Sequence, residues 1–263
     1  MSRPLYYQLV PYYELVEGRD WVGEVKLIAS ILRKAGSETV IDLGCGPGYH
    51  ARALSKLGFN ATGVDISTPN ILFARNKARE EGVHARFVVG SYYNYRPNEN
   101  VDACLCLNWS IPTRDDEIHR FLRNTRSILR IGGLLILDYE RISDIVWNDL
   151  GKPTVSSWHL KELIIVRVSV GRMISNVLHS RDVYMLFAKC SRPRIPNEAA
   201  RYGGASGSSS VRVYVDSSYV RFFSIPELRR FAARSGFRLV ENHVLPRNGY
   251  KRNYAVLEKV VDP

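Results

Sequence analysis

One nine-residue segment constrains the fold more than any other feature of the chain. Residues 40–48 read Val-Ile-Asp-Leu-Gly-Cys-Gly-Pro-Gly, a pattern typical of a buried strand followed by glycines at every second position. A helical pattern runs from Tyr49 to Leu57, and Gly58 ends it. Glycine allows backbone angles that side chains forbid and lets the backbone approach a ligand closely. The segment therefore predicts a strand, a ligand-binding turn and a helix in succession.

Strands and helices alternate along the first half of the chain. Helical patterns are expected at 21–35, 49–57, 70–81 and 117–129, and buried-strand patterns at 39–43, 61–65, 86–90, 101–107 and 134–138, the last entered through a turn at Gly132-Gly133. Strands separated by helices of this length predict a parallel sheet with helices on both faces. The pattern returns at Ser224, which forms a capping box with Glu227 before a helix. Two last strands are expected at 237–240 and 254–259.

The rhythm changes between these two parts. Residues 158–190 are rich in Val, Ile and Leu with polar interruptions, which favours antiparallel hairpins, and 203–210 has the composition of a flexible loop. We therefore predict an α/β, Rossmann-like fold: a seven-stranded, mostly parallel sheet with an antiparallel insertion that covers the substrate side. The expected division is 1–140 for an N-terminal cap segment and the main part of the core, 141–222 for the insertion, and 223–263 for the rest of the core.

Composition narrows the class of protein. Apolar residues make up 45% of the 263, enough for a large core, and no apolar run reaches the roughly 18 residues that span a bilayer. The first residues lack the apolar run of a signal peptide, and the four cysteines form no C-x-x-C pair, so a reduced, cytoplasmic chain without a metal site is expected. The net charge of +11 fits either a solvated helix face or a surface for nucleic acid or an acidic metabolite.

The glycine spacing distinguishes between nucleotide-binding motifs. A dinucleotide fingerprint reads G-x-G-x-x-G, whereas residues 42–48 read D-x-G-x-G-x-G, and no G-x-x-x-x-G-K-[ST] loop occurs. This segment resembles motif one of the class I S-adenosylmethionine-dependent methyltransferases. Three further segments resemble that family in the same order along the chain: Gly63-Val64-Asp65-Ile66-Ser67, residues 129–138 and residues 223–237.

The resemblance implies S-adenosylmethionine as the cofactor. The three glycines would pass under its methionine moiety, Asp42 would orient the turn, and Asp65 would accept hydrogen bonds from the ribose hydroxyls. Ile66 would lie against the adenine. The family commonly has Asp after the third strand, but Gly90-Ser91 stands here, so Ser91 or a backbone group would serve. The expected cofactor-binding residues are Tyr13, Arg19, Asp42, Gly44, Cys45, Gly46, Gly48, Asp65, Ile66, Ser91, Tyr92 and Leu107.

The N-terminal region carries a second resemblance. Tyr12-Tyr13-Glu14-Leu15, followed by Gly18-Arg19-Asp20-Trp21, is similar to the start of small-molecule N-methyltransferases of the amino-sugar and glycine or sarcosine types. In that group a tyrosine closes over the site and an arginine pairs with the cofactor carboxylate, which Arg19 would do here. A surface arginine beside a helix start is the alternative. Residues 108–113 also resemble this group.

Methyl transfer needs little help from side chains. An amine acceptor needs at most a group to take its proton, whereas a hydroxyl needs a base. The candidates to orient or deprotonate the acceptor are Tyr13, Asn108 and His179, although a lone His in an antiparallel hairpin is more often structural or exposed. Three functions are considered: a small-molecule N- or O-methyltransferase, a tRNA, rRNA or protein methyltransferase, and a non-enzymatic cofactor-binding module. The first is favoured, because no Pro-Pro follows Asn108 and no appended RNA-binding domain is evident. The acceptor and the oligomeric state are not predicted.

Overall fold

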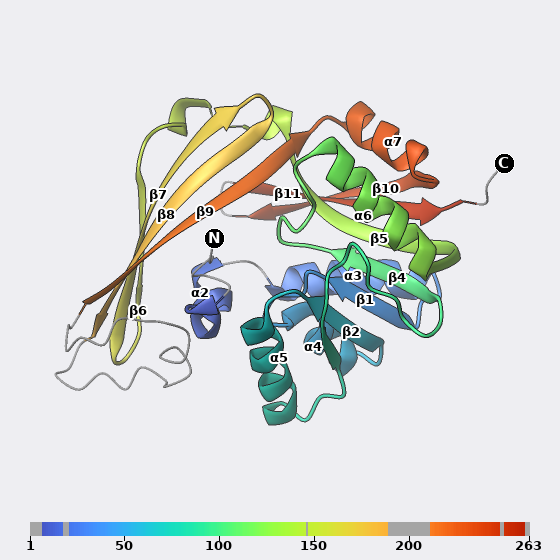
Figure 1. The fold of residues 1–263 in the computed structure, drawn as a ribbon, viewed down its shortest axis with the longest axis horizontal. Helices are drawn as coiled ribbons and strands as arrows, with labels where there is room; N and C mark the ends of the chain where they lie inside the picture. Colours follow the sequence, from blue (N-terminus) through green and yellow to red (C-terminus); the bar gives the residue numbers. More distant parts are fainter. Residues whose placement is uncertain (1–6, 18–20, 146, 189–210, 248–249, 261–263) are drawn as a thin grey trace. The chain divides into compact units, whose positions relative to one another are not determined.

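The structure is a computed structural model that describes residues 7–17, 21–145, 147–188, 211–247 and 250–260 (Figure 1). These residues form two compact units. One comprises 7–17, 147–188 and 211–220, and the other comprises 21–145, 221–247 and 250–260. The sequence-based division had placed the first residues in an N-terminal cap segment ahead of the core. The loop expected at 203–210 lies outside the described residues.

A central sheet forms the larger unit. Its strands are β1 (Thr39–Leu43), β2 (Asn60–Asp65), β3 (Arg86–Val89), β4 (Val101–Cys106), β5 (Leu129–Arg141), β10 (Phe237–Arg247) and β11 (Tyr250–Lys259). The order is β3-β2-β1-β4-β5-β11-β10. The first five strands are parallel, and β11 runs antiparallel to both of its neighbours. The predicted seven-stranded, mostly parallel sheet is confirmed.

Helices cover both faces of this sheet, as predicted (Figure 1). One face carries α3 (Trp21–Lys34), α4 (Tyr49–Lys56) and α5 (Thr68–Glu80), and the other carries α6 (Asp115–Ile128) and α7 (Ile225–Arg234). The two faces follow from the alternation of side chains along a strand. Val40 packs with Ile28 and Leu54 on the first face, whereas Ile41 packs with Phe121 on the second. The capping box of Ser224 and Glu227 opens α7 as predicted.

Three predicted strands differ in extent from the structure. Gly132 and Gly133 do not form a turn before the fifth strand but lie within β5. Pairing with β4 shifts there, because Val101 pairs with Leu129 while Ala103 pairs with Leu134, and Gly132 has a φ of 73°. A bulge of this kind inserts residues without ending a strand. The last two strands are also longer than predicted, since their pairing continues to Arg247 and Tyr250.

Antiparallel strands build most of the smaller unit. β6 (Thr154–His159), β7 (Leu163–Ile174) and β8 (Val177–Ala188) pair antiparallel, and β9 (Val211–Phe223), most of which belongs to this unit, is the neighbour of β8. The short helices η1 (Val10–Tyr12), α2 (Tyr13–Glu17) and η3 (Trp147–Asp149) belong here, while η2 (Ile142–Asp144) belongs to the larger unit. The predicted antiparallel region is confirmed, and its position over the substrate side stays a prediction. None of the helices in the described ranges is both long and apolar enough to cross a lipid bilayer.

Candidate active site

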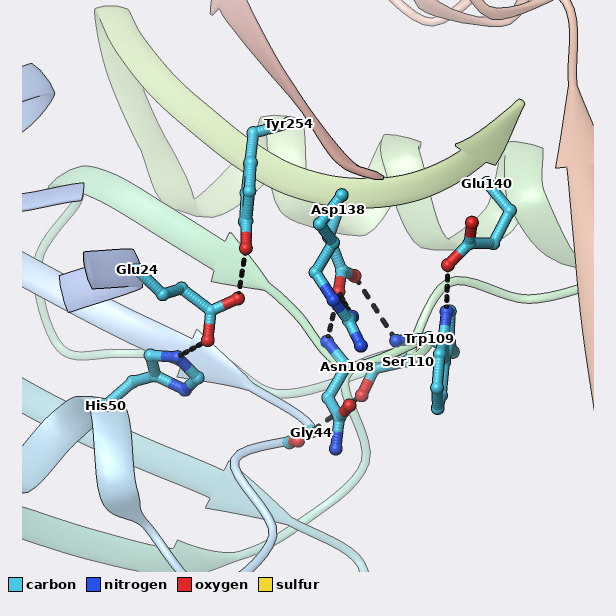
Figure 2. A network of polar contacts seen from close by, with 10 residues as sticks. Glu24, Gly44, His50, Asn108, Trp109, Ser110, Asp138, Glu140 and Tyr254 are labelled. Carbon is cyan, nitrogen blue, oxygen red and sulfur yellow. Dashed lines mark hydrogen bonds and ion pairs between the residues drawn. The ribbon is translucent and has the colours of Figure 1, made fainter. Parts of the chain in front are cut away.

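The site lies where the sheet reverses its winding. From β1 the chain continues through α4 to β2 on one side, and from β4 it continues through α6 to β5 on the other side. In open α/β sheets, ligands bind beyond the carboxyl ends of the strands at such a reversal. The loops that follow β1 and β4 contact each other here, since Ser110 Oγ donates to the Gly44 carbonyl oxygen at 3.4 Å (Figure 2).

The turn after β1 needs its three glycines for two different reasons. Gly44, Gly46 and Gly48 have φ values of 80°, 52° and 79°, a region that other residues rarely adopt. A Cβ on Gly44 would lie 2.9 Å from Ser110 Oγ, and one on Gly48 would lie 2.4 Å from Phe87 Cε1. A Cβ on Gly46 would meet no atom of the described residues within 4 Å. Gly44 and Gly48 are therefore packed against protein, while Gly46 faces space in which a ligand can approach.

Asp65 ends β2 and holds this turn. Its Oδ2 accepts from the Gly46 N–H at 2.8 Å, and its Oδ1 accepts from the Ser67 N–H at 2.7 Å. Burial raises the pKa of this carboxyl, although both backbone N–H groups favour the ionised form. Each carboxylate oxygen can accept two hydrogen bonds, so both oxygens keep capacity for a further donor. The arrangement is compatible with the predicted contact to two ribose hydroxyls.

Asp42 and Cys45 lie beneath the turn rather than on its surface. Both side chains are buried, and Cys45 Sγ lies 3.6 Å from the Gly46 carbonyl oxygen. Burial, reinforced by the charges of Asp42 and Asp65, raises the pKa of the Cys45 thiol well above its usual range. The thiol is therefore neutral, and it packs in the core beside Gly63.

The predicted adenine contacts have different environments. Ile66, which directly follows Asp65, is 73% exposed. An apolar side chain that contacts the adenine only when the ligand is bound would be exposed in this way. Ser91 Oγ accepts from the Tyr93 N–H at 3.3 Å, and a Cβ on Gly44 would lie 3.8 Å from the Tyr92 ring. Burial raises the pKa of Tyr92. Leu107 is only 2% exposed and packs in the core, which leaves its backbone as the part that can face a ligand.

Asn108 and Trp109, directly after β4, adopt an unusual backbone conformation. Their φ values are 60° and 57°, and a non-glycine residue held in this region costs about 1–3 kcal/mol. Asn tolerates it better than a bulky Trp does. Buried Asp138 of β5 supports the pair: its Oδ2 accepts from the Asn108 N–H at 2.9 Å, and its Oδ1 accepts from the Trp109 N–H at 3.2 Å. Figure 2 shows the carboxylate reaching both residues.

Two further groups fix the Trp109 side chain. Its Nε1 donates to Glu140 Oε1 at 2.8 Å, and burial raises the pKa of that carboxyl. The Arg252 guanidinium lies 4.6 Å from the ring centroid, and its Nη1 donates to Asp138 Oδ2 at 2.5 Å. Glu140 and Arg252 were not predicted from the sequence, because no local pattern links β5 to β11.

A second polar group, on the face of the sheet that carries α3 and α4, was also missed. Glu24 of α3 is buried and binds His50 Nε2 at 2.8 Å and the Tyr254 hydroxyl at 2.5 Å (Figure 2). His50 is the second residue of α4 and therefore follows the glycine turn directly. The Trp21 ring lies 5.6 Å from the His50 ring. Three partners so far apart in the sequence leave no motif that could have predicted them.

The remaining predicted site residues lie elsewhere in the chain. Tyr13 begins α2 and is buried, and His179 lies in β8 with its ring 4.9 Å from that of Tyr219. Both belong to the smaller unit, and their catalytic roles stay predictions. Arg19 lies outside the described residues. The structure therefore brings together Gly44, Gly46, Asp65, Tyr92 and Asn108 as the central members of the predicted site.

Comparisons with known proteins agree with this geometry. A family described as a methyltransferase domain matches residues 40–133. Human glycine N-methyltransferase is 27% identical over 153 residues, 52% of this chain and 52% of that protein. A ubiquinone biosynthesis O-methyltransferase of Paramagnetospirillum magneticum is 28% identical over 107 residues, 41% of this chain and 42% of that protein. The chain thus spans about half the length of the curated relatives it matches, or less.

The fold comparison extends over the whole chain. An amino pentose methyltransferase of Micromonospora echinaspora, solved with S-adenosylmethionine bound, has a TM-score of 0.71 and 17% identity, covering 99% of this chain and 100% of that one. The sheet order and the glycine turn at the reversal point define a Rossmann-like methyltransferase fold. Residues 40–133 thus match a methyltransferase domain family, and the chain shares the Rossmann-like methyltransferase fold.

Proposed function

We propose that this protein transfers a methyl group from S-adenosylmethionine to a nitrogen, or an oxygen, of a small molecule. The observation that carries the proposal is the turn after β1. Three glycines at positive φ hold it open, Gly46 faces free space, and Asp65 lies within hydrogen-bond distance of it. Each of these features suits a nucleoside-bearing ligand that lies along the turn.

The residues present fit the cofactor on chemical grounds. Asp65 keeps acceptor capacity for ribose hydroxyls, and exposed Ile66 offers an apolar surface to a purine. The first turn of α4 begins at Gly48, which has no side-chain cap, so its N–H groups and their positive potential can serve an anionic group. Asp42, buried below the turn, contributes negative charge near the expected position of a sulfonium.

The chain's own residues would position the reactants and exclude water. When bound, the cofactor supplies an electrophilic methyl group on a positively charged sulfur. The turn at 44–48 fixes that end of the ligand, and the loop at 108–113 lies beside it, because Ser110 contacts Gly44. Asn108, the first residue of this loop, is our candidate to orient the acceptor. Such placement accounts for much of the rate of a bimolecular reaction.

A nitrogen acceptor is our first choice. The resemblance of residues 12–21 and 108–113 to small-molecule N-methyltransferases supports nitrogen, as does the relationship to glycine N-methyltransferase. The similarity to a ubiquinone biosynthesis O-methyltransferase supports oxygen as the alternative. An amine presents its own lone pair, so nitrogen transfer makes no demand for a strong base among the described residues of the core unit.

The first experiment measures cofactor binding by calorimetry. We expect wild-type protein to bind both S-adenosylmethionine and S-adenosylhomocysteine, and Asp65→Ala to reduce the affinity for each by roughly 100-fold, because two charge-assisted hydrogen bonds are lost. Asp116→Ala, on the exposed start of α6, is the matched control and should bind as the wild type does. Absence of heat with either nucleoside would contradict the proposal.

The second experiment identifies the acceptor class. Three separate reactions each contain the wild-type protein and methyl-labelled S-adenosylmethionine. The first adds a metabolite extract, the second total tRNA and the third total protein. We expect label in the metabolite fraction alone. Label in acid-precipitable RNA or protein would instead support a macromolecular acceptor.

A further inference from the structure

Two aspartates, Asp138 of β5 and Asp102 of β4, make similar contacts at opposite ends of these neighbouring strands. Asp138, near the carboxyl end of β5, accepts from two consecutive backbone N–H groups, those of Asn108 and Trp109, and pairs with Arg252 at 2.5 Å. Asp102, near the amino end of β4, accepts from the Glu38 and Thr39 N–H groups and pairs with Arg130 at 2.5 Å.

The two carboxylates differ in what they hold. Asp102 ties down Glu38 and Thr39 at the entry to β1, neither of which has a positive φ. Asp138 ties down two residues that both have positive φ, at the end of β4 beside the glycine turn. Asn alone can favour this conformation locally, but two such residues in succession, the second a bulky Trp, need an acceptor for both N–H groups to keep it.

Arg252 completes the support from β11. Its guanidinium is bound to Asp138 Oδ2 and lies over the Trp109 ring, so one planar group holds both the carboxylate and the side chain next to it. Glu140 holds the Trp109 indole from β5. The loop after β4 is therefore anchored from two neighbouring strands.

We infer that Asp138 and Arg252 are positioning residues that keep Asn108 and Trp109 in the left-handed conformation required at the acceptor side of the site. This inference rests on the proposed function for its catalytic consequence, but its structural part does not. The carboxylate would not touch the reactants. It would act through the backbone of Asn108 by fixing where that residue presents its side chain.

The test compares Asp138→Asn with Asp102→Asn in the full-length protein. Asn offers one acceptor oxygen in place of two, so Asp138→Asn leaves one of the two loop N–H groups without its acceptor. We expect hydrogen exchange at Asn108 and Trp109 to accelerate at least about tenfold, and kcat with the identified acceptor to fall roughly 100-fold. The Kd for S-adenosylhomocysteine should stay within about threefold of the wild-type value.

The control should behave in the opposite way. Asp102→Asn should leave exchange at Asn108 and Trp109 unchanged and kcat within about threefold, because the remaining Asn oxygen can still accept from both Glu38 and Thr39, which share one oxygen of Asp102. Arg252→Lys keeps the ion pair but loses the planar contact with Trp109, so its exchange rates at Asn108 and Trp109 should fall between those of wild type and Asp138→Asn. If Asp138→Asn does not fold, the exchange rates of Arg252→Lys at Asn108 and Trp109 test the inference in its place.

Two results would overturn the inference: unchanged exchange at Asn108 and Trp109 in the Asp138 or Arg252 variant, or a fall in kcat no larger than that of Asp102→Asn. A wild-type protein that binds no S-adenosylhomocysteine would defeat the proposed function instead. The exchange comparison would still decide whether Asp138 holds the loop.

Discussion

At the scale of single residues, Gly46 and Gly48 have different reasons to be glycine: Gly48 is packed against protein, whereas Gly46 faces open space. Both have positive φ, but only Gly48 has neighbours where a Cβ would lie, namely Phe87 and Ala74. Their substitution by alanine changes the same number of atoms in the same turn. The two variants therefore form a matched pair in which folding and binding should respond differently.

We expect Gly48→Ala to lower the free energy of unfolding by about 2–4 kcal/mol, because the methyl group overlaps buried Phe87 and the φ is unfavourable. Gly46→Ala should lower it by only about 1 kcal/mol, from the φ alone. It should nevertheless weaken S-adenosylhomocysteine binding roughly tenfold or more, because its methyl group enters the open space at the turn. Urea unfolding measures the free energy of unfolding, and calorimetry measures the affinity for S-adenosylhomocysteine. Equal losses of stability would show that the turn is packed alike at both glycines.

The pKa of Asp102 predicts how the free energy of unfolding depends on pH, independently of catalysis. Burial acts to raise the pKa of this carboxyl, but hydrogen bonds from Thr39 and Glu38 outweigh it and lower the pKa to about 2. A carboxyl with a depressed pKa stabilises the fold above its unfolded pKa, and this contribution is lost as the pH falls through the folded value. At pH 7 it amounts to about 2 kcal/mol.

The penalty of Asp102→Asn should therefore be largest near neutral pH and should shrink progressively below about pH 4. Urea unfolding of both proteins between pH 7 and pH 3 measures it. A penalty that stays constant over this range would show that the carboxylate charge contributes nothing.

At the scale of elements, local sequence was sufficient wherever an element is determined by its own residues. The glycine turn, the box of Ser224 and Glu227, and the apolar runs of β1 to β4 all appear where they were predicted. Each depends on backbone angles, on a cap three residues away or on a continuous buried run. These are short-range causes.

Elements and contacts that depend on distant partners were not predictable in the same way. The extensions of β10 and β11 depend on their pairing with each other, and the passage of Gly132 through β5 depends on its register with β4. At the site, Asp138 ends the predicted fifth strand, but its partner Arg252 lies 114 residues away. Glu24 is separated from Tyr254 by 230 residues. Only the folded sheet brings such residues together.

At the scale of the whole molecule, the net charge of +11 allows a test of whether RNA binding and methyl transfer are linked. A surface of this charge should bind RNA without sequence preference at 50 mM salt and lose this binding steeply by 200 mM. Methyl transfer to the small acceptor should change far less over the same range, because its binding does not release many counterions. Fluorescence anisotropy with labelled tRNA and parallel turnover assays measure the two. Activity that falls together with RNA binding would favour a nucleic-acid acceptor.

The pairing of β5 with β11 has a consequence for how the chain is made. β5 lies between β4, which precedes it, and β11, which is synthesised more than one hundred residues later. While the ribosome is still extending the chain, six positions of β5, Leu134 to Tyr139, await their partners on one side. An unpaired, apolar strand edge readily pairs with other chains. A nascent chain of this protein should therefore depend on chaperones until residues 253–258 have emerged from the exit tunnel.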